Sequence, residues 1–199
     1  MNNMTTKCII AIAYCDKLEE NLQMASEFSQ AIEEICSVTH DNRYVMAPQQ
    51  ESIIGQYIGE PTKGNFQFIF DTHINEGDDL IIYIDDHSVW GEGVKFYFKD
   101  HSAWYQLYYY ELYDMIQNIN LNSTKIILRG NQSGIPLNEF SGCCVLASMR
   151  ADEDLGDQID LYNIGQQLIN LGTCNLEAAH DEESQRLPPY QHPVKNCPP

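Results

Sequence analysis

The chain of 199 residues predicts an α/β fold, in which helices cover both faces of a mostly parallel sheet. Two observations predict it. Continuous apolar runs, which are typical of strands buried on both faces, occur at 8–14, 78–84, 125–128 and 143–148. Between them lie stretches whose apolar residues recur every three or four positions, which is the period of an amphipathic helix. No repeat or linker divides the chain, so we expect three layers within a single domain spanning 1–199.

The first apolar run, CIIAIAY, predicts a buried strand, and the residues after it predict a helix. Asp16, followed three positions later by Glu19, has the spacing of a capping box, which marks a helix start. Helical spacing then continues through Leu18, Leu22, Ala25, Phe28, Ile32 and Ile35. Residues 37–60 are polar and irregular, and no regular element is predicted there.

A second helix is predicted at PTKGNFQFIFDTHINEG, with Thr62 as its cap and Gly77 beyond its end. One face of this helix carries Phe66, Ile69, Phe70 and Ile74. The run DDLIIYI follows as the second strand and ends in DDHS. The glycines of GEG at 91–93 then indicate a small hairpin.

Two further helices are predicted in the second half of the chain. One of them is indicated by the helical spacing of Leu112, Met115, Ile116 and Ile119. The other spans 159–171 and ends before Gly172, with an inner face made of Leu161, Ile164, Leu168 and Leu171. We therefore expect the core to span about 7–172. The remaining residues, 173–199, are rich in proline and acid, and we expect an extended C-terminal segment.

The charge balance argues against two classes of partner. Lys and Arg number 11 and Asp and Glu number 29, which gives a formal net charge of -18. Such a surface repels phosphate backbones and anionic lipid, so we expect neither nucleic acid nor membrane as a partner. The run at 8–14 is far too short to span a bilayer and is marginal as a signal segment. We expect a cytoplasmic protein.

The cysteines and glycines predict no disulfide, metal or cofactor. Seven cysteines have no regular spacing, two of them are adjacent, and no CxxC pair occurs, so reduced thiols are expected. The sequence holds neither a GxGxxG dinucleotide motif nor a phosphate-binding GKS/T motif. Carboxylates at 78–79 and 85–86 are interpreted as ordinary ends of a strand, although a divalent cation is an alternative.

Polar residues follow two of the predicted strands at the edge where ligand sites form. In sheets of this class, ligands bind outside the carboxyl ends of the strands. DDHS lies at one such end and GNQSG at another, so His87 and Asn131 are expected on the same edge. His87 follows Asp85 and Asp86, whose carboxylates favour imidazolium, so it is a candidate general base. The alternative is a histidine that is structural or merely exposed.

The residues around these two positions resemble a known superfamily. TKGNFQFIF followed by GDDLIIYIDDHS is similar to the segment of caspase and legumain cysteine peptidases that ends in a catalytic HG pair. ELYDMIQNI followed by TKIILRGNQSG is similar to the helix, strand and nucleophile motif E/Q-A-C-x-S/G-G. His87 precedes Asn131 by 44 positions, close to the roughly 50 expected in caspase-type sequences. GCCVLASMRADED resembles the next strand, and the resemblance implies a caspase-like three-layer fold.

The resemblance implies a role for each matching position. His87 matches the base, and Ser88 replaces the usual glycine while keeping a backbone N–H for an oxyanion. Asn131 stands where the family has its nucleophilic cysteine. Arg129 matches a pocket residue of the family, where it would favour an acidic ligand; the alternative is an arginine at the rim that pairs with a surface acid. Asp86 is the second candidate ligand-binding side chain.

Asn131 decides the functional expectation. An amide cannot form the thioester, and losing such a nucleophile costs on the order of a million-fold in turnover. We therefore expect an inactive or impaired peptidase homologue that binds a peptide or protein partner. The alternatives are an active cysteine-type endopeptidase with a displaced nucleophile, and a deliberately inactivated peptidase. The candidates for a displaced nucleophile are Ser133, Cys143, Cys144 and Cys174.

Overall fold

The computed structural model describes residues 5–13, 18–48, 54–90, 93–97, 104–131, 133–153 and 161–198. Within these ranges, side chains are described except at 86–90, 95, 97, 104–105, 131 and 135. The Asp16–Glu19 capping box therefore lies partly outside the described residues. No helix in the described part of the chain is long and apolar enough to span a membrane.

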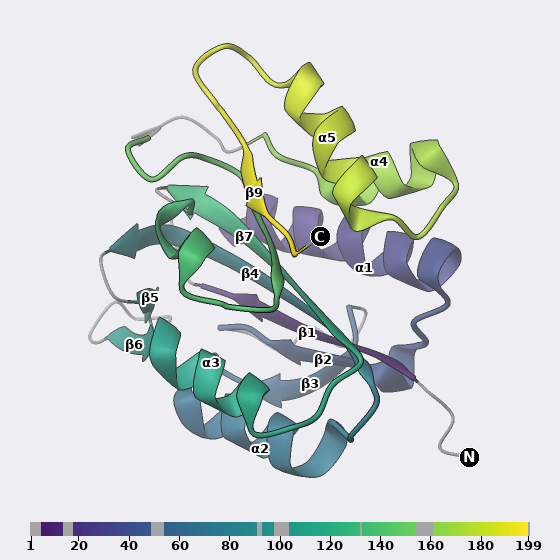
Figure 1. The fold of residues 1–199 in the computed structure, drawn as a ribbon, viewed down its shortest axis with the longest axis vertical. Coiled ribbons are helices and arrows are strands. Elements are labelled where there is room, and N and C mark those ends of the chain that lie inside the picture. Colours follow the sequence, from purple (N-terminus) through teal and green to yellow (C-terminus); the bar gives the residue numbers. More distant parts are fainter. Residues whose placement is uncertain are drawn as a thin grey trace.

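A twisted sheet forms the middle layer (Figure 1). Its strand order is β3-β2-β1-β4-β7-β8-β9, and every neighbouring pair is parallel except β8 with β9. The strands are β1 (Thr6–Ile12), β2 (Arg43–Met46), β3 (Gln56–Gly59), β4 (Asp79–Trp90), β7 (Ser123–Asn131), β8 (Cys144–Ala147) and β9 (Val194–Asn196). An antiparallel extension of β4 adds β5 (Gly93–Tyr97) and β6 (Trp104–Tyr108).

Helices cover both faces of this sheet, so the predicted three-layer α/β arrangement is confirmed (Figure 1). One face packs against α2 (Lys63–His73) and α3 (Tyr109–Gln117). The other packs against α1 (Leu18–Cys36), α4 (Ile164–Leu171) and α5 (Leu176–Arg186). Short 3-10 helices are η1 (His40–Asn42) and η2 (Ile135–Asn138).

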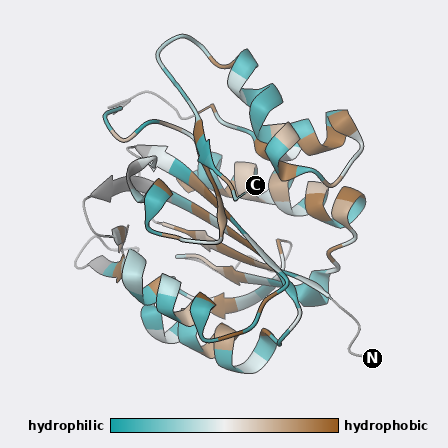
Figure 2. Cartoon of the chain, in the orientation of Figure 1, coloured by the Kyte–Doolittle hydropathy of each residue, from teal (hydrophilic) through white to brown (hydrophobic). Residues whose placement is uncertain are grey.

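Alternation along the strands assigns each side chain to one of these faces. In β4, Ile82 and Ile84 join the core beside α2 and α3, whereas Ile81 and Tyr83 join the core beside α1, α4 and α5. Figure 2 shows the strands as predominantly hydrophobic and the outward surfaces of the helices as mostly hydrophilic. This pattern is the burial on both faces that the continuous apolar runs predict.

The predicted helix ends agree with the local geometry at two positions. The side chain of Thr62 accepts a hydrogen bond from the backbone N–H of Asn65 at 3.2 Å and so caps α2. Gly172 follows α4 with φ 63, in the left-handed region that favours glycine, and its N–H donates to the carbonyl of Leu168.

Three sequence expectations about secondary structure and packing are wrong. Residues 37–60, expected to be irregular, contain β2 and β3. These strands have only four residues each, which is too few to give a clear sequence pattern. The C-terminal segment, expected to be extended, contains α5 followed by β9. Leu161 and Leu171 are exposed rather than on the inner face of the fourth helix: Leu161 precedes α4, which begins at Ile164, and Leu171 is its last residue.

The prediction of reduced thiols is wrong for four of the seven cysteines. Cys36 is bonded to Cys174, and Cys144 is bonded to Cys197, which ties α1 and β8 to the C-terminal segment. Sequence spacing could not reveal these partners, since they are 138 and 53 positions apart and only the fold brings them together. Because disulfides persist mainly in oxidising compartments, these bonds weigh against a cytosolic setting.

The C-terminal segment also contains a buried histidine. His180 of α5 is 2% exposed, and its Nδ1 lies 2.7 Å from the hydroxyl of Tyr162. Burial lowers the pKa of His180 to about 4; Lys195 lowers it further, and Asp181 opposes the shift. The folded protein therefore keeps this imidazole neutral at pH values where the unfolded chain takes up a proton.

We expect His180 to make the fold less stable as the pH falls. The unfolded imidazole titrates near 6.5 and the folded one near 4, so this contribution is present above 6.5 and is lost between these values. The loss is roughly 3 kcal/mol in total. Urea unfolding between pH 7 and pH 4 measures it, with His180→Gln as the matched variant, because glutamine offers Tyr162 a partner without titrating. Parallel pH profiles for the two proteins would contradict the expectation.

Candidate functional site

The backbone brings the two predicted site positions to one edge of the sheet. β4 and β7 are parallel neighbours, and their register places Asp85 opposite Arg129 and Ser88 opposite Asn131. The register shifts between Asp85 and Ser88, where one strand carries an irregularity. The DDHS segment is thus part of β4, which continues to Trp90, rather than a loop after the strand. The side chains of Asp86, His87, Ser88 and Asn131 lie outside the described ones.

A buried ion pair lies directly beneath these positions. Nη1 of Arg129 donates to both carboxylate oxygens of Asp85, at 2.9 and 2.7 Å. The two side chains are only 2% and 1% exposed. Two charges buried this deeply are stable only with close pairing and further hydrogen bonds. The pair therefore links β4 to β7 one step before the candidate site.

Strand alternation explains which neighbours complete the pair. Asp85 continues the series that contains Ile81 and Tyr83, so its side chain points toward α1. There Asn21 of α1 accepts a hydrogen bond from Nη1 of Arg129 at 2.9 Å. The hydroxyl of Tyr83 donates to Oδ2 of Asp85 at 3.2 Å. The ion pair is thereby held from the sheet and from a helix.

This arrangement differs from both interpretations of Arg129 made from the sequence. Arg129 does not lie at the rim, because it is buried, and its partner Asp85 is a buried carboxylate rather than a surface one. Its charge is neutralised within the protein, which removes the reason to expect an acidic ligand. From the sequence, Asp85 was expected to act on the charge of His87. In the structure its carboxylate pairs with Arg129.

The turn that follows β7 is supported by serine hydroxyls. The backbone N–H of Gly130 donates to Oγ of Ser148 at 3.1 Å, and that Oγ lies 3.2 Å from Oγ of Ser133. The N–H of Met149 donates to Oγ of Ser133 at 3.0 Å. A Cβ on Gly134 would come within 2.7 Å of the Met149 carbonyl oxygen, so glycine is needed there. These contacts hold both sides of the Asn131 position.

The candidates for a displaced nucleophile are otherwise engaged. Ser133 is fully buried in the hydroxyl network. Cys144 and Cys174 are in disulfides. Cys143 belongs to the core beside α2 and α3, on the other face of the sheet from the ion pair. Burial raises the pKa of its thiol to about 11, which disfavours the thiolate. Burial also raises the pKa of Cys8 well above that of an ordinary thiol.

Three of the four carboxylates near the second strand have described side chains, and these three do not gather into one metal site; the side chain of Asp86 lies outside the described ones. Asp78 and Asp79 lie at the start of β4, and Asp85 lies near the other edge of the sheet. Asp79 accepts hydrogen bonds from Asn122 and Ser123, whereas Asp85 is paired with arginine. Within the described part of the chain, the one group of ligand-type side chains close enough for a metal ion is Cys144, Glu177 and Cys197.

A cavity of about 430 Å³ lies at the opposite edge of the sheet from the candidate site. It is lined by the end of α3, the loop after it and the start of β7, including Asn118, Asn120 and Thr124. Its position is at the amino end of the strands, so it does not contribute to the candidate site.

Two residues of the site were missed by sequence reasoning. Asn21 lies within a predicted helix, and an asparagine there carries no signal for an arginine partner 108 positions away. Ser148 is the last residue of the predicted strand 143–148 and directly follows β8 in the structure, and this position at the carboxyl edge could have marked it. Strand alternation could also have placed Asp85 and Arg129 on the same face of the sheet.

Comparisons with known proteins agree with the fold but name no family. No family model and no curated protein matches the chain. Among solved structures, Raptor from Chaetomium thermophilum aligns with 91% of the chain at 11% identity and a TM-score of 0.50, and the chain spans 20% of its length. Protein GSU0716 from Geobacter sulfurreducens aligns over 98% of this chain and 94% of its own, at 10% identity and a TM-score of 0.53. Such low identities show similarity of fold alone.

Proposed function

We propose that the chain is a non-catalytic homologue of caspase and legumain-type peptidases that binds a peptide or protein partner. The observation that carries the proposal is the register of β4 and β7, which sets Ser88 opposite Asn131 at the carboxyl edge of the sheet. His87, the proposed base, precedes Ser88 in β4, so base and nucleophile positions stand on neighbouring strands, as the two-residue chemistry of these peptidases needs.

Three further observations support a binding role without catalysis. Asn131 offers an amide instead of a thiol, and an amide has no accessible anionic form. Ser133 is occupied by hydrogen bonds to Ser148 and Met149. Hydrogen bonds hold the chain before Asn131, at Gly130, and after it, at Ser133. A peptidase-like edge that keeps its support but lacks its nucleophile is suited to holding a ligand.

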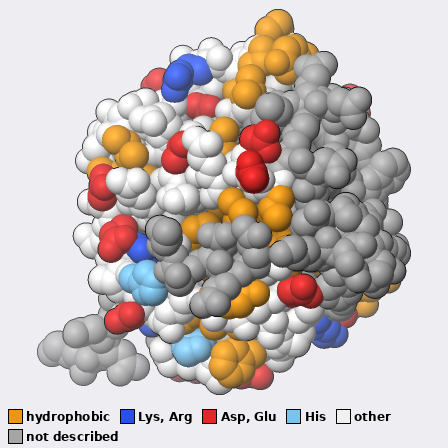
Figure 3. All heavy atoms as spheres, turned by 180° about the vertical axis from the view of Figure 1, so that it is seen from behind, with side chains coloured by type: hydrophobic (Ala, Val, Ile, Leu, Met, Phe, Trp, Pro, Cys, Tyr) orange, Lys and Arg blue, Asp and Glu red, His pale blue; other side chains and the backbone are white. Residues whose placement is uncertain are grey.

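The charges restrict the ligand class of the proposed site. Arg129 and Asp85 neutralise each other, so the pocket position carries no net charge from this pair. The protein as a whole has a formal net charge of -18, and Figure 3 shows acidic side chains scattered over the face that it draws. A neutral or basic peptide segment therefore fits better than an acidic one.

The alternative is an active cysteine endopeptidase in which another thiol serves His87. Ile12, the last residue of β1, pairs with Asp85, and the N–H of Ala13 donates to the Asp85 carbonyl at 2.8 Å. Cys15 follows two positions later in the sequence and lies outside the described residues. This proximity along the chain makes Cys15 the thiol to test.

The expected result for the wild-type protein is peptide binding without turnover. A library of fluorogenic peptides of differing charge, incubated with the oxidised full chain, should show no cleavage above the buffer rate. Fluorescence polarisation should show that basic peptides bind more tightly than matched acidic ones. His87→Ala should leave the absence of turnover unchanged.

Two outcomes of this assay would contradict the proposal. Turnover by the wild type that disappears in Cys15→Ser and in His87→Ala would establish the active alternative. Absence of binding to every peptide class, in protein shown to be folded by circular dichroism, would remove the ligand-binding role. A cytoplasmic location, expected from the sequence, forms no part of the proposal because the two disulfides favour an oxidising compartment.

A further inference from the structure

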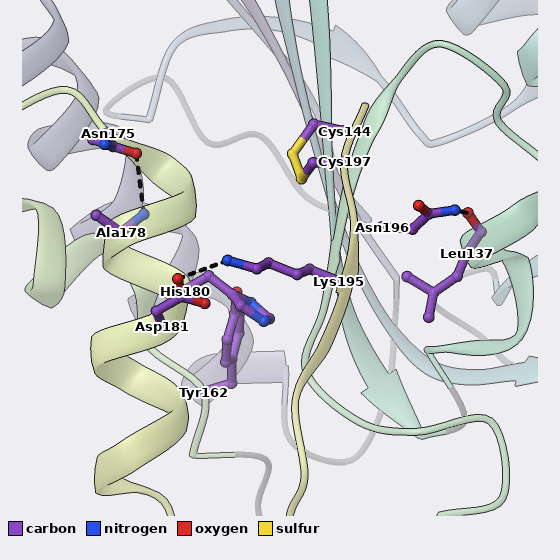
Figure 4. The surroundings of a disulfide bond; sticks show 10 residues. All are labelled: Leu137, Cys144, Tyr162, Asn175, Ala178, His180, Asp181, Lys195, Asn196 and Cys197. Carbon is purple, nitrogen blue, oxygen red and sulfur yellow. Dashed lines mark hydrogen bonds and ion pairs between the residues drawn. A yellow bond between two sulfur atoms is a disulfide. The ribbon is translucent and has the colours of Figure 1, made fainter. Parts of the chain in front are cut away.

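The disulfide between Cys144 and Cys197 lies beside a carboxylate. Sγ of Cys144, Sγ of Cys197 and a carboxylate oxygen of Glu177 all lie within 4.8 Å of one another. The three residues come from β8, from the chain just after β9, and from the first turn of α5. Figure 4 shows the disulfide between β8 and the C-terminal strand, with α5 facing them.

The packing of α5 against the C-terminal strand explains why these groups meet. On α5, Glu177 and Asp181 are one helical turn apart and share a face. On the strand, Lys195 and Cys197 are two positions apart and point to the same side. Nζ of Lys195 lies 2.6 Å from Oδ2 of Asp181, while the side chain of Asn196 points the other way, to the carbonyl of Leu137 (Figure 4). The same register places Cys197 beside Glu177.

We propose that Cys144, Cys197 and Glu177 form a Zn²⁺ site when the disulfide is reduced. Two thiolates and one carboxylate are ligands that Zn²⁺ accepts, and a water molecule completes a tetrahedral set. Cys197 and Glu177 are only partly buried, which gives the ion a path from solvent, whereas Cys144 is buried. Cys144 and Cys197 would thus be joined either by the disulfide or through the bound Zn²⁺. In both states the C-terminal strand stays attached to β8.

The exchange between the two states balances in electrons and protons. A dithiol reductant delivers two electrons and two protons to the disulfide and becomes a cyclic disulfide itself, which leaves two cysteine thiols. Binding of Zn²⁺ then displaces both thiol protons to solvent.

The second disulfide provides an internal comparison. Cys36 and Cys174 are also cross-linked, but within the described part of the chain no carboxylate or imidazole joins them in a group that a metal could occupy. Both disulfides attach the C-terminal segment. The proposed difference between them is the carboxylate of Glu177.

Cobalt titration tests the proposal, because Co²⁺ bound by thiolates in a tetrahedral site absorbs light in the visible range and through sulfur-to-metal charge transfer. The full-length protein, reduced with a phosphine under anaerobic conditions, should bind one equivalent of Co²⁺, and Zn²⁺ should displace it. The oxidised protein should bind none. Glu177→Gln should weaken binding about tenfold or more, and the pair Cys144→Ser with Cys197→Ser should abolish it.

The matched control is the pair Cys36→Ser with Cys174→Ser, which should bind Co²⁺ like the wild type. Charge-transfer absorption that survives the loss of Cys144 and Cys197, or a Co²⁺ affinity that Glu177→Gln leaves unchanged, would overturn the site. So would its absence from the reduced wild type. If reduction alone unfolds the protein, Zn²⁺ should restore its circular dichroism; failure to restore it would also overturn the proposal.

Discussion

Replacing Asp85 by alanine is expected to lower the free energy of unfolding by about 3–5 kcal/mol. The substitution leaves the guanidinium of Arg129 buried without its carboxylate, while Nη1 keeps its hydrogen bond to Asn21. The cost comes mainly from this uncompensated charge rather than from the lost attraction. Urea unfolding of the two proteins at pH 7, followed by circular dichroism, measures the difference.

Two controls separate this effect from general disturbance of the sheet. The double substitution Asp85→Leu with Arg129→Met removes both charges and keeps apolar volume, so it should recover most of the lost stability. Lys63→Met breaks the ion pair between Lys63 and Glu111. Because the side chain of Lys63 is 50% exposed, the loss in free energy of unfolding should be less than about 1 kcal/mol. Equal losses for Asp85→Ala and the double substitution would show that the buried charge is not the cause.

The fold could be predicted from local pattern because its strands and helices differ in period. Continuous apolar runs marked β1, β4, β7 and β8, and each is buried on both faces. Helical spacing found α1, α2 and α3, and the cap Thr62 was found because capping needs only neighbouring residues. The elements that were missed are short or depend on distant partners. β9, for example, has three residues and pairs with β8, which lies about 50 positions earlier.

The site was predictable as a place but not as a set of contacts. The rule that ligands lie at the carboxyl ends of parallel strands put His87 and Asn131 on one edge, and the register of β4 with β7 agrees. The partner of Arg129 was not predictable, because 29 acidic residues compete for it in the sequence and only burial selects Asp85. The disulfides escaped for the same reason, since contact between distant cysteines depends on the complete fold.

Asn131→Cys is expected to convert the site into a reactive one. A thiol at this position, next to the proposed base His87, should exist as thiolate near neutral pH and react with an electrophilic peptide probe. At pH 6 an ordinary thiol with a pKa near 8.5 is mostly protonated, so labelling that persists at pH 6 marks activation. Removing the base by His87→Ala should slow labelling of the Asn131→Cys protein about a hundredfold or more.

The control variants separate the new thiol from those already present. The wild type and Asn131→Ala contain every native cysteine, so their labelling defines the background. Cys15→Ser combined with Asn131→Cys removes the thiol of the active alternative and should label as fast as Asn131→Cys alone. Mass spectrometry of the labelled peptide identifies the modified residue.

The rate of probe labelling in Asn131→Cys, with and without His87, tests most directly whether this edge is a peptidase site that lacks only its nucleophile. We expect labelling at position 131 that persists at pH 6 and depends on His87, with only background labelling of the wild type. A rate equal to that of an exposed free thiol and unchanged by His87→Ala would contradict it.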